Sequence, residues 1–222
     1  MIKLINLLIR KPAVSVEDFQ EYLRAKRAGF VRQLPEVKEY KQCHTLLSGY
    51  KRKTPPPLDG MEEMYLDSTT GIESLQKKLD DLSGSPEWSD FVDIGRTKSI
   101  ITEEFLIKPG AIHENMVKNI ELVIRKKSMP LDEFHTYWEK HHGPLAARIE
   151  SIRRYVQSHT LMSEYKKPQP PWYDGTAETW FDDTNGMRMS AASPEYVEVR
   201  ADEKNFLAEE LPFVIAREIR IF

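Results

Sequence analysis

The sequence lacks several features that mark common classes of protein. Its single cysteine, Cys43, cannot form an internal disulfide, which fits a reducing compartment. No apolar run reaches the roughly 20 residues that a membrane-spanning helix needs. The formal net charge of −3 leaves no basic excess for binding nucleic acid. The chain also has no glycine-rich phosphate loop and no nucleophile elbow around a serine. These absences argue against membrane, nucleic-acid-binding and nucleotide-dependent proteins.

The apolar segment at residues 2–9 resembles a signal peptide at first sight. It has almost no basic n-region and no small-residue cleavage site. A similar segment recurs in the middle of the chain, where a signal peptide would have no purpose. We therefore predict that residues 2–9 form a β-strand and that the protein is cytoplasmic.

An internal duplication is the main feature that the sequence does have. An offset of 115 positions (125 − 10) places Arg10 on Arg125, and most of residues 2–71 then align without a gap. The pattern Tyr40-x-Gln42-x-His44 falls on Tyr155-x-Gln157-x-His159, and Asp59-Gly60 falls on Asp174-Gly175. Two copies are too few for a solenoid. We predict a first repeat at residues 1–108, a linker at 109–116 and a second repeat at 117–222.

Each repeat has the periodicities of a β-α-β-β-α-β unit. In the second repeat, residues 119–125 and 154–161 alternate like strands, whereas apolar residues three and four apart between 131 and 152 indicate an amphipathic helix. A third strand follows at 176–182, then a weak helix at 187–207 and a last strand at 213–222. This order predicts an α+β fold of two ferredoxin-like repeats. We expect their sheets to pack face to face as a single-chain pseudo-dimer of the dimeric α+β barrel type, with homodimerisation as a further option.

The two repeats differ most along the first helix. The second repeat has His141 and His142 followed by Gly143-Pro144, whereas Arg27 takes the place of His142 in the first. A helical wheel places His142 at the margin of the buried face, and Pro144 should disturb the helix there and open a pocket. A histidine in such a pocket can act as an acid or a base near neutral pH. The alternative is a histidine that bonds to a backbone carbonyl at a helix break.

Polar residues also recur on the strands. The Tyr-x-Gln-x-His pattern occurs in both repeats, which favours a structural role, but Tyr155 and His159 alone have His142 as a possible partner. Glu178 and Trp180 share one face of their strand, and we expect an ion pair between Glu178 and Arg125 rather than a catalytic acid. The spacing of the histidines does not match a zinc site, so no metal is predicted.

Three motifs together resemble a known family. They are the helix pattern from Phe134 through Trp138 and His142 to Leu145, the strand pattern from Arg154 to His159, and the run from Tyr173 to Phe181. In this combination the second repeat resembles the EthD family, and the first repeat departs from it at the helix. The resemblance implies the dimeric α+β barrel fold and acid–base work by His142 and Tyr155, with His159 beside them.

The sequence therefore predicts a cofactor-independent enzyme, a lyase or isomerase. It would isomerise, dehydrate, cyclise or decarboxylate a small hydrophobic carbonyl compound of aromatic or polyketide-like type. The predicted catalytic residues are His142, Tyr155 and His159, and the predicted substrate contacts are Trp138, His141, Glu178 and Trp180. Two alternatives remain open: a non-catalytic protein that binds a small ligand or assists a partner enzyme, and a haem-binding protein.

Overall fold

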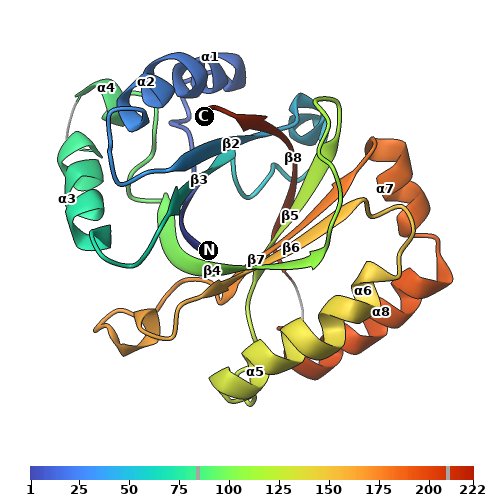
Figure 1. Ribbon diagram of the computed structural model, residues 1–222. Coiled ribbons are helices and arrows are strands. Elements are labelled where there is room, and N and C mark those ends of the chain that lie inside the picture. The colour runs from blue at the N-terminus through green and yellow to red at the C-terminus, as the bar shows by residue number, and fades with distance from the viewer. Residues whose placement is uncertain (84–85, 209–210) are drawn as a thin grey trace. The chain divides into compact units, whose positions relative to one another are not determined.

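The computed structural model of the protein describes residues 1–83, 86–208 and 211–222. The chain divides into two compact units, Met1–Ile101 with Glu218–Phe222, and Thr102–Arg217 (Figure 1). The long strand β4 (Lys98–Lys108) and the last strand β8 (Phe213–Arg220) each contribute residues to both units. Within the described residues, no helix is both long and apolar enough to span a membrane.

The first unit has three strands in the order β1-β3-β2, all antiparallel. The first residues of β4 lie beside β1, where Ser99 Oγ donates to Asn6 Oδ1 over 2.7 Å. The elements are β1 (Ile2–Leu8), α1 (Val16–Tyr22), the π-helical turn η1 (Leu23–Arg27), α2 (Ala28–Val31), β2 (Glu39–Thr45), the 3-10 turn η2 (Leu47–Lys51), β3 (Gly60–Leu66), α3 (Ile72–Ser83) and α4 (Pro86–Ser89).

The second unit repeats this order of elements and contains the predicted EthD-like repeat. Its strands are arranged β8-β5-β7-β6-β4, and each strand pairs antiparallel with its neighbours. Helices α5, α6 and α8 cover one face of this sheet (Figure 1). The elements are β5 (Val117–Val123), α5 (Leu131–Tyr137), the π-helical turn η3 (Trp138–His142), α6 (Gly143–Ala147), β6 (Arg154–Thr160), the 3-10 turn η4 (Glu164–Lys166), β7 (Gly175–Phe181), α7 (Thr184–Ser190) and α8 (Pro194–Phe206).

The predicted second helix of this unit is two helices, α7 and α8. The break falls at Ser193, whose hydroxyl caps α8 by accepting the backbone N–H of Tyr196 at 3.2 Å. Pro194 then occupies the first turn, where its missing N–H costs nothing, although it could not continue α7. The weak helical signal across 187–207 therefore came from two short helices joined at a capped proline.

The apolar helix faces pack on the sheet as the sequence predicted. In the second unit, a buried cluster joins Phe134 and Trp138 of the first helical segment to Phe206 of α8 and Val123 of β5. Burying each large side chain of this kind contributes roughly 1.5–3 kcal/mol, so the cluster anchors both helices firmly. Gly175 lets the Trp138 ring approach the sheet, since an added Cβ would lie 2.1 Å from the Ser158 carbonyl oxygen and 2.9 Å from that ring.

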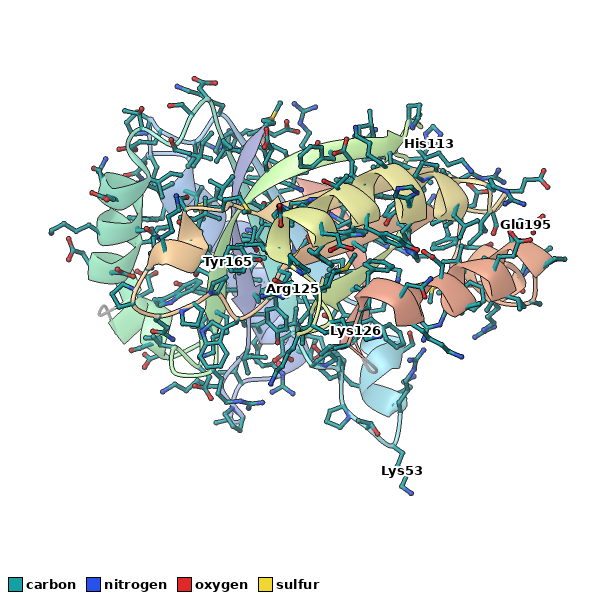
Figure 2. All side chains as sticks on the ribbon, turned by 90° about the horizontal axis from the view of Figure 1, so that it is seen from below. Lys53, His113, Arg125, Lys126, Tyr165 and Glu195 are labelled. Carbon is teal, nitrogen blue, oxygen red and sulfur yellow. The ribbon has the colours of Figure 1, made fainter. Side chains whose placement is uncertain are left out.

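The arginines at equivalent ends of the repeats do not pair with the strand glutamates. Arg125 instead bonds to Asp174, through its backbone N–H at 2.8 Å and its guanidinium at 3.4 Å. Tyr165 donates to the same carboxylate at 2.7 Å, and Figure 2 shows Arg125 and Tyr165 close together. Glu178 pairs with Lys118 at 2.5 Å. The expected ion pair of Glu178 therefore exists, but its predicted partner was wrong, because Arg125 lies beyond the end of the strand.

Candidate functional site

The helix that carries His142 is interrupted by the π-helical turn η3, in which the helical turn contains one extra residue and is therefore wider. The disturbance that the sequence predicted is therefore present, but Pro144 is not its cause. The first unit has the same π-helical turn, η1, followed by alanine and glycine rather than glycine and proline. π-helical turns are rare and frequently occur at functional sites. A feature shared by the two repeats must maintain the turn in both.

A strand glutamine is that shared feature. Gln157 donates from Nε2 to the carbonyl oxygen of Trp138, the first residue of η3, at 2.9 Å. In the first unit, Gln42 donates in the same way to the Leu23 carbonyl at 2.7 Å. Both glutamines are fully buried, so these bonds satisfy amide groups that water cannot reach. The central residue of the Tyr-x-Gln-x-His pattern therefore ties the π-helical turn to the sheet.

The same glutamine determines which atoms of Tyr155 and His159 donate hydrogen bonds and which accept them. Because Gln157 Nε2 is the donor, its Oε1 is an acceptor, and His159 must donate from Nε2 over 2.9 Å. Gln157 also donates to the Tyr155 hydroxyl oxygen at 2.9 Å, and Trp138 Nε1 donates to it at 3.3 Å. Tyr155 thus accepts twice, and its own hydroxyl hydrogen has no acceptor among the described residues. Burial raises the pKa of Tyr155, so this hydrogen is retained at neutral pH.

His142 is held by a carboxylate from α8. Its Nδ1 lies 2.9 Å from Asp202 Oδ2, while Asp202 Oδ1 accepts from Tyr137 at 2.5 Å and from Asn205 at 3.1 Å. An ionised carboxylate can only accept, so Nδ1 carries the hydrogen and Nε2 carries the lone pair. Burial lowers the pKa of His142 despite the opposing effect of Asp202, which keeps the ring neutral at pH 7. A buried neutral imidazole with one free lone pair has the form of a general base.

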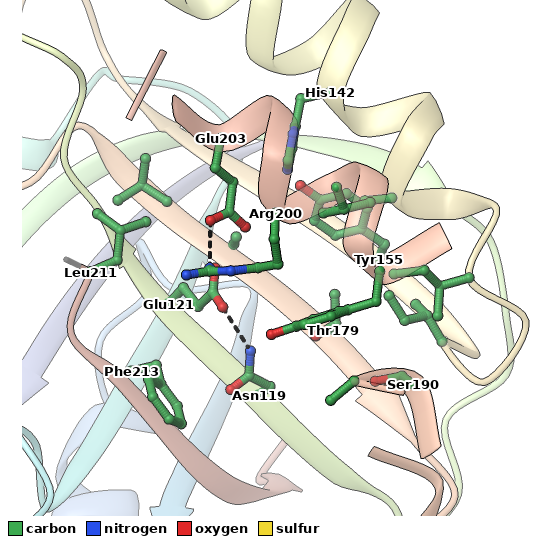
Figure 3. Close-up of a pocket in the computed structure, with 18 of the residues that line it drawn as sticks. Asn119, Glu121, His142, Tyr155, Thr179, Ser190, Arg200, Glu203, Leu211 and Phe213 are labelled. Carbon is green, nitrogen blue, oxygen red and sulfur yellow. Dashed lines mark hydrogen bonds and ion pairs between the residues drawn. The ribbon is translucent and has the colours of Figure 1, made fainter. Parts of the chain in front are cut away.

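His142 and Tyr155 line one cavity of about 390 Å³ between the sheet and the helices of the second unit (Figure 3). This volume suits a small organic molecule. Apolar side chains form most of the wall, and polar residues form the rest. These polar residues are Asn119, Glu121, His142, Tyr155, Thr179, Ser190, Tyr196, Arg200 and Glu203.

Two carboxylates and an arginine lie at another part of this cavity. Arg200 forms an ion pair with Glu203, and Glu121 accepts a long hydrogen bond of 3.5 Å from Asn119 (Figure 3). Burial, and then the charge of Glu121, raise the pKa of Glu203 to about 7. Burial also raises the pKa of Glu121. The cavity therefore holds one acid, Glu203, that can carry a proton near neutral pH.

The structure brings together three of the residues predicted from the sequence, His142, Tyr155 and Trp138. His159 lies outside the cavity, stacked on the Trp138 ring with 4.2 Å between centroids and an angle of 4°. His141 is exposed and contacts the Tyr137 ring at 5.1 Å.

Glu178 and Trp180 point away from the cavity. Successive side chains of a strand point to opposite faces, and it is Ala177, Thr179 and Phe181 of β7 that face the cavity. Lys118 reaches both side chains on the other face, with its Nζ 4.5 Å from the centre of the Trp180 ring. Neither side chain is therefore positioned to contact a ligand in this cavity.

Sequence reasoning missed Asn119, Glu121, Arg200, Asp202 and Glu203. Alternation along residues 119–125 did separate Asn119 and Glu121 from the apolar face, and this was the available signal. Helix α8 is charged around most of its circumference, so no periodicity indicated which of its side chains face inward. Asp202 is 60 positions from His142, and only the packing of α8 against η3 joins them.

The corresponding region of the first unit is occupied by an ion pair. Arg27 replaces His142 and bonds to Glu62 through Nε at 2.8 Å and Nη2 at 3.0 Å. Tyr40 donates to the same carboxylate, and Asn6 does so at 3.1 Å. The Arg27 guanidinium also lies 4.2 Å from the Trp88 ring centre. Because Arg27 and Glu62 are paired with each other, neither is free to act as a base, and the cavity here is only about 180 Å³.

One group of side chains has metal-ligand character. Potential ligand atoms of Cys43, Glu63 and Glu218 lie within 4.8 Å of one another, and this is the single such group of three among the residues described. Lys3 already donates to Glu63 at 2.7 Å and supplies a positive charge there. An ammonium group in this position competes with a cation, so we assign no metal to the group.

The fold and the cavity define the second unit as a ferredoxin-like domain with a small-molecule pocket between sheet and helices. Residues 126–210 match the EthD family model, described as the EthD domain, which confirms the resemblance that the motifs of the second repeat predicted. No curated protein matches the chain.

The solved structures that are similar over nearly the whole length include the following two. An anthrone oxidase-like protein is 10% identical with a TM-score of 0.66, covering 98% of this chain and 91% of its own. A mutant chlorite dismutase from Candidatus Nitrospira defluvii is 9% identical with a TM-score of 0.58, covering 99% and 91%. At these identities the likeness concerns the fold alone. The predicted class, α+β with two ferredoxin-like repeats of the kind found in dimeric α+β barrel proteins, is confirmed.

Proposed function

We propose that this protein is an enzyme that moves protons on a small hydrophobic carbonyl compound of aromatic or polyketide-like type. Isomerisation, dehydration, cyclisation and decarboxylation all belong to this chemistry. The observation that supports it is the pairing of a free imidazole lone pair on His142 with an unused hydroxyl hydrogen on Tyr155 in one cavity. No residue of the first unit offers the same pair, because Arg27 replaces the histidine.

The roles follow from which atom donates and which accepts. His142 Nε2 takes a proton from the carbon next to the substrate carbonyl, and Tyr155 donates its free hydrogen bond to the oxygen on which negative charge develops. Asp202 stabilises the imidazolium that forms, because it bonds to Nδ1–H. The imidazolium then returns its proton, to another carbon in an isomerisation or to a departing hydroxyl in a dehydration. Trp138 forms the apolar wall beside Tyr155 and orients it through Nε1.

His159 acts through Gln157 in this proposal. It fixes the orientation of the glutamine amide, which in turn holds Tyr155 and the first carbonyl of η3. Burial lowers the pKa of His159 to about 3, so it stays neutral and keeps this pattern of donors at physiological pH. His159 is therefore a positioning residue.

Proton exchange tests the proposal without knowledge of the natural substrate. The protein is incubated in D2O with 2-tetralone and with anthrone, and deuterium uptake at the activated carbon is followed by mass spectrometry. Wild-type protein should accelerate the exchange of at least one ketone, and His142→Ala should remove roughly 10²–10⁴-fold of that acceleration. Tyr155→Phe should lower it, whereas His141→Ala, the exposed neighbour, should leave it unchanged. Equal exchange by wild type and His142→Ala would refute the proposal and favour a binding protein.

A further inference from the structure

Glu203 lines the same cavity as His142 and Tyr155, but the removal of a proton by His142 makes no use of it. It follows Asp202 directly in α8, so the two side chains point about 100° apart around the helix. Asp202 bonds to Nδ1 of His142, whereas Glu203 borders the cavity itself. One turn of α8 therefore supplies both the residue that orients the base and a second carboxyl group.

One oxygen of the Glu203 carboxyl group is available to a ligand. Its Oε2 atom pairs with the guanidinium of Arg200, one turn earlier in α8. Its Oε1 atom has no hydrogen-bond partner among the described residues and, unlike Oδ1 of Asn119, is not completely buried. In Figure 3, the side chains of Glu203 and His142 both extend from helical segments toward the sheet. A ligand in the cavity can therefore reach Oε1 of Glu203.

The charges around Glu203 let this carboxyl group gain and lose a proton near neutral pH. Burial and then the charge of Glu121 on β5 raise its pKa to about 7, Asp202 acts in the same direction, and Arg200 opposes them. The other titratable groups within electrostatic reach are two tyrosines with raised pKa values, Tyr155 and Tyr196. Glu203 can therefore donate a proton, and Arg200 stabilises the carboxylate that remains.

His142 is held too firmly to serve two positions of a ligand. Its Nδ1 bonds to Asp202 at 2.9 Å, and its ring packs on the Phe206 ring with 4.7 Å between centroids. Rotation of the ring would break the bond to Asp202 and move Nε2 away from its place. A base held in this way suits the removal of a proton at one carbon, and a second group is better placed to deliver a proton elsewhere.

We propose that Glu203 is the second proton-transfer residue of this site: His142 removes a proton from one atom of the ligand, and Glu203 delivers a proton to another. In the isomerisation of an unsaturated ketone, Nε2 of His142 takes the proton next to the carbonyl, and the electron pair moves toward the oxygen on Tyr155. Glu203, instead of the imidazolium, then protonates the remote carbon of the dienolate, and its carboxylate stays paired with Arg200. His142 releases its proton to water and Glu203 takes one up. This assignment rests on the proposed function and adds a second catalytic residue to it.

The ketone 3-cyclohexen-1-one tests both transfers in one molecule. Exchange of its C2 hydrogens in D2O requires His142 alone, whereas isomerisation to 2-cyclohexen-1-one also requires a proton at C4. Mass spectrometry follows the exchange, and ultraviolet absorbance of the conjugated product follows the isomerisation. Glu203→Gln should lower the isomerisation roughly 10²–10⁴-fold and leave the exchange within about threefold of wild type, because an amide keeps the shape but cannot act as the acid. Glu203→Asp should restore part of the isomerisation, and Glu198→Gln, an exposed change in the same helix, should affect neither rate.

The pH profiles separate a catalytic role of Glu203 from a structural one. In wild type, the isomerisation should fall as the pH rises through the pKa of about 7 at which Glu203 loses its proton, whereas the exchange should not fall. The remaining isomerisation of Glu203→Gln should lack this decrease, because no carboxyl group titrates at that position.

The outcomes distinguish this inference from the proposed function. Wild-type isomerisation by Glu203→Gln would overturn the inference and leave the function of His142 intact. So would an equal loss of exchange and isomerisation in that variant, or a wild type that exchanges 2-tetralone but does not isomerise the probe. A wild type that exchanges neither ketone would refute the proposed function and the inference together.

Discussion

The replacement Asp202→Asn changes one atom of the candidate site and should reverse the hydrogen-bonding role of His142. Oδ1 of Asp202 accepts from Tyr137 and Asn205, and Oδ2 faces His142 Nδ1. An asparagine that keeps its oxygen at the first position places its NH₂ group opposite Nδ1. That group donates, so Nδ1 must accept, and the ring hydrogen moves to Nε2. The lone pair is then on the wrong side of the ring to act in the cavity.

The expected size of the effect follows from the role of a general base. Such a base contributes roughly 10²–10⁴-fold to a rate, which corresponds to about 3–5 kcal/mol of activation free energy. Burial lowers the pKa of His142, and the charge of Asp202 partly offsets this. Removing that charge should therefore lower the pKa of His142 further. In wild type, activity should rise with pH through a value below 6.5, and in the variant this limb should move to lower pH.

Two measurements check the prediction. The rate of deuterium exchange measures the loss of function, and ¹⁵N chemical shifts of His142 identify which ring nitrogen carries the hydrogen. Asn205→Ala is the matched control, because it removes another partner of Asp202 and leaves His142 Nδ1–H in place. A hydrogen that stays on Nδ1 in the variant would contradict the predicted reversal of the hydrogen-bonding role. Wild-type exchange with the hydrogen on Nε2 would refute the assignment of His142 as the base.

Three further predictions concern stability. The raised pKa of Glu203, from 4.5 to about 7, means that the fold favours the protonated acid. The free energy of unfolding should therefore fall by up to about 3 kcal/mol as the pH rises through that range. In urea unfolding, Glu203→Gln should stabilise the protein at pH 8 and change little at pH 4, whereas the exposed control Glu198→Gln should not show this dependence on pH. Arg27→Ala should cost roughly 3–5 kcal/mol in urea unfolding, because it leaves the buried carboxylate of Glu62 without its ion-pair partner. A loss below about 1 kcal/mol would show that this ion pair does not stabilise the first unit. Gly175→Ala should lower the melting temperature, because the added Cβ would lie 2.1 Å from a backbone oxygen. Gly29→Ala is the contrasting control: it lies in a helix with open space around it, so the replacement should raise the free energy of unfolding by up to about 1 kcal/mol.

The repeat and the secondary structure could be predicted from the sequence because they depend on local periodicity. Alternation along 154–161 predicted β6 within one residue, and apolar spacing identified Phe134 and Trp138 as core residues of the first helix. The difference between His142 and Arg27 was visible by aligning the two repeats. These features require only that side chains repeat every two or 3.6 positions.

The choice between the two faces of the sheet could not be made in this way. Glu178 and Trp180 were predicted as substrate contacts, whereas Asn119 and Glu121 line the cavity from the other face. Both faces of β7 mix polar and apolar residues, so the pattern of that strand does not indicate which face borders a cavity. The answer depends on where the helices fail to fill the space above the sheet.

The sequence by itself determined that this protein is a tandem pair of ferredoxin-like repeats, that the second is EthD-like, and that one helix carries the distinguishing histidine. Tertiary structure decided what that histidine can do. Asp202 reaches it from α8, and Gln157 holds the π-helical turn and the tyrosine from β6. Hydrogen-bond direction and pKa depend on partners that are distant in the chain, and packing alone brings those partners within 3 Å.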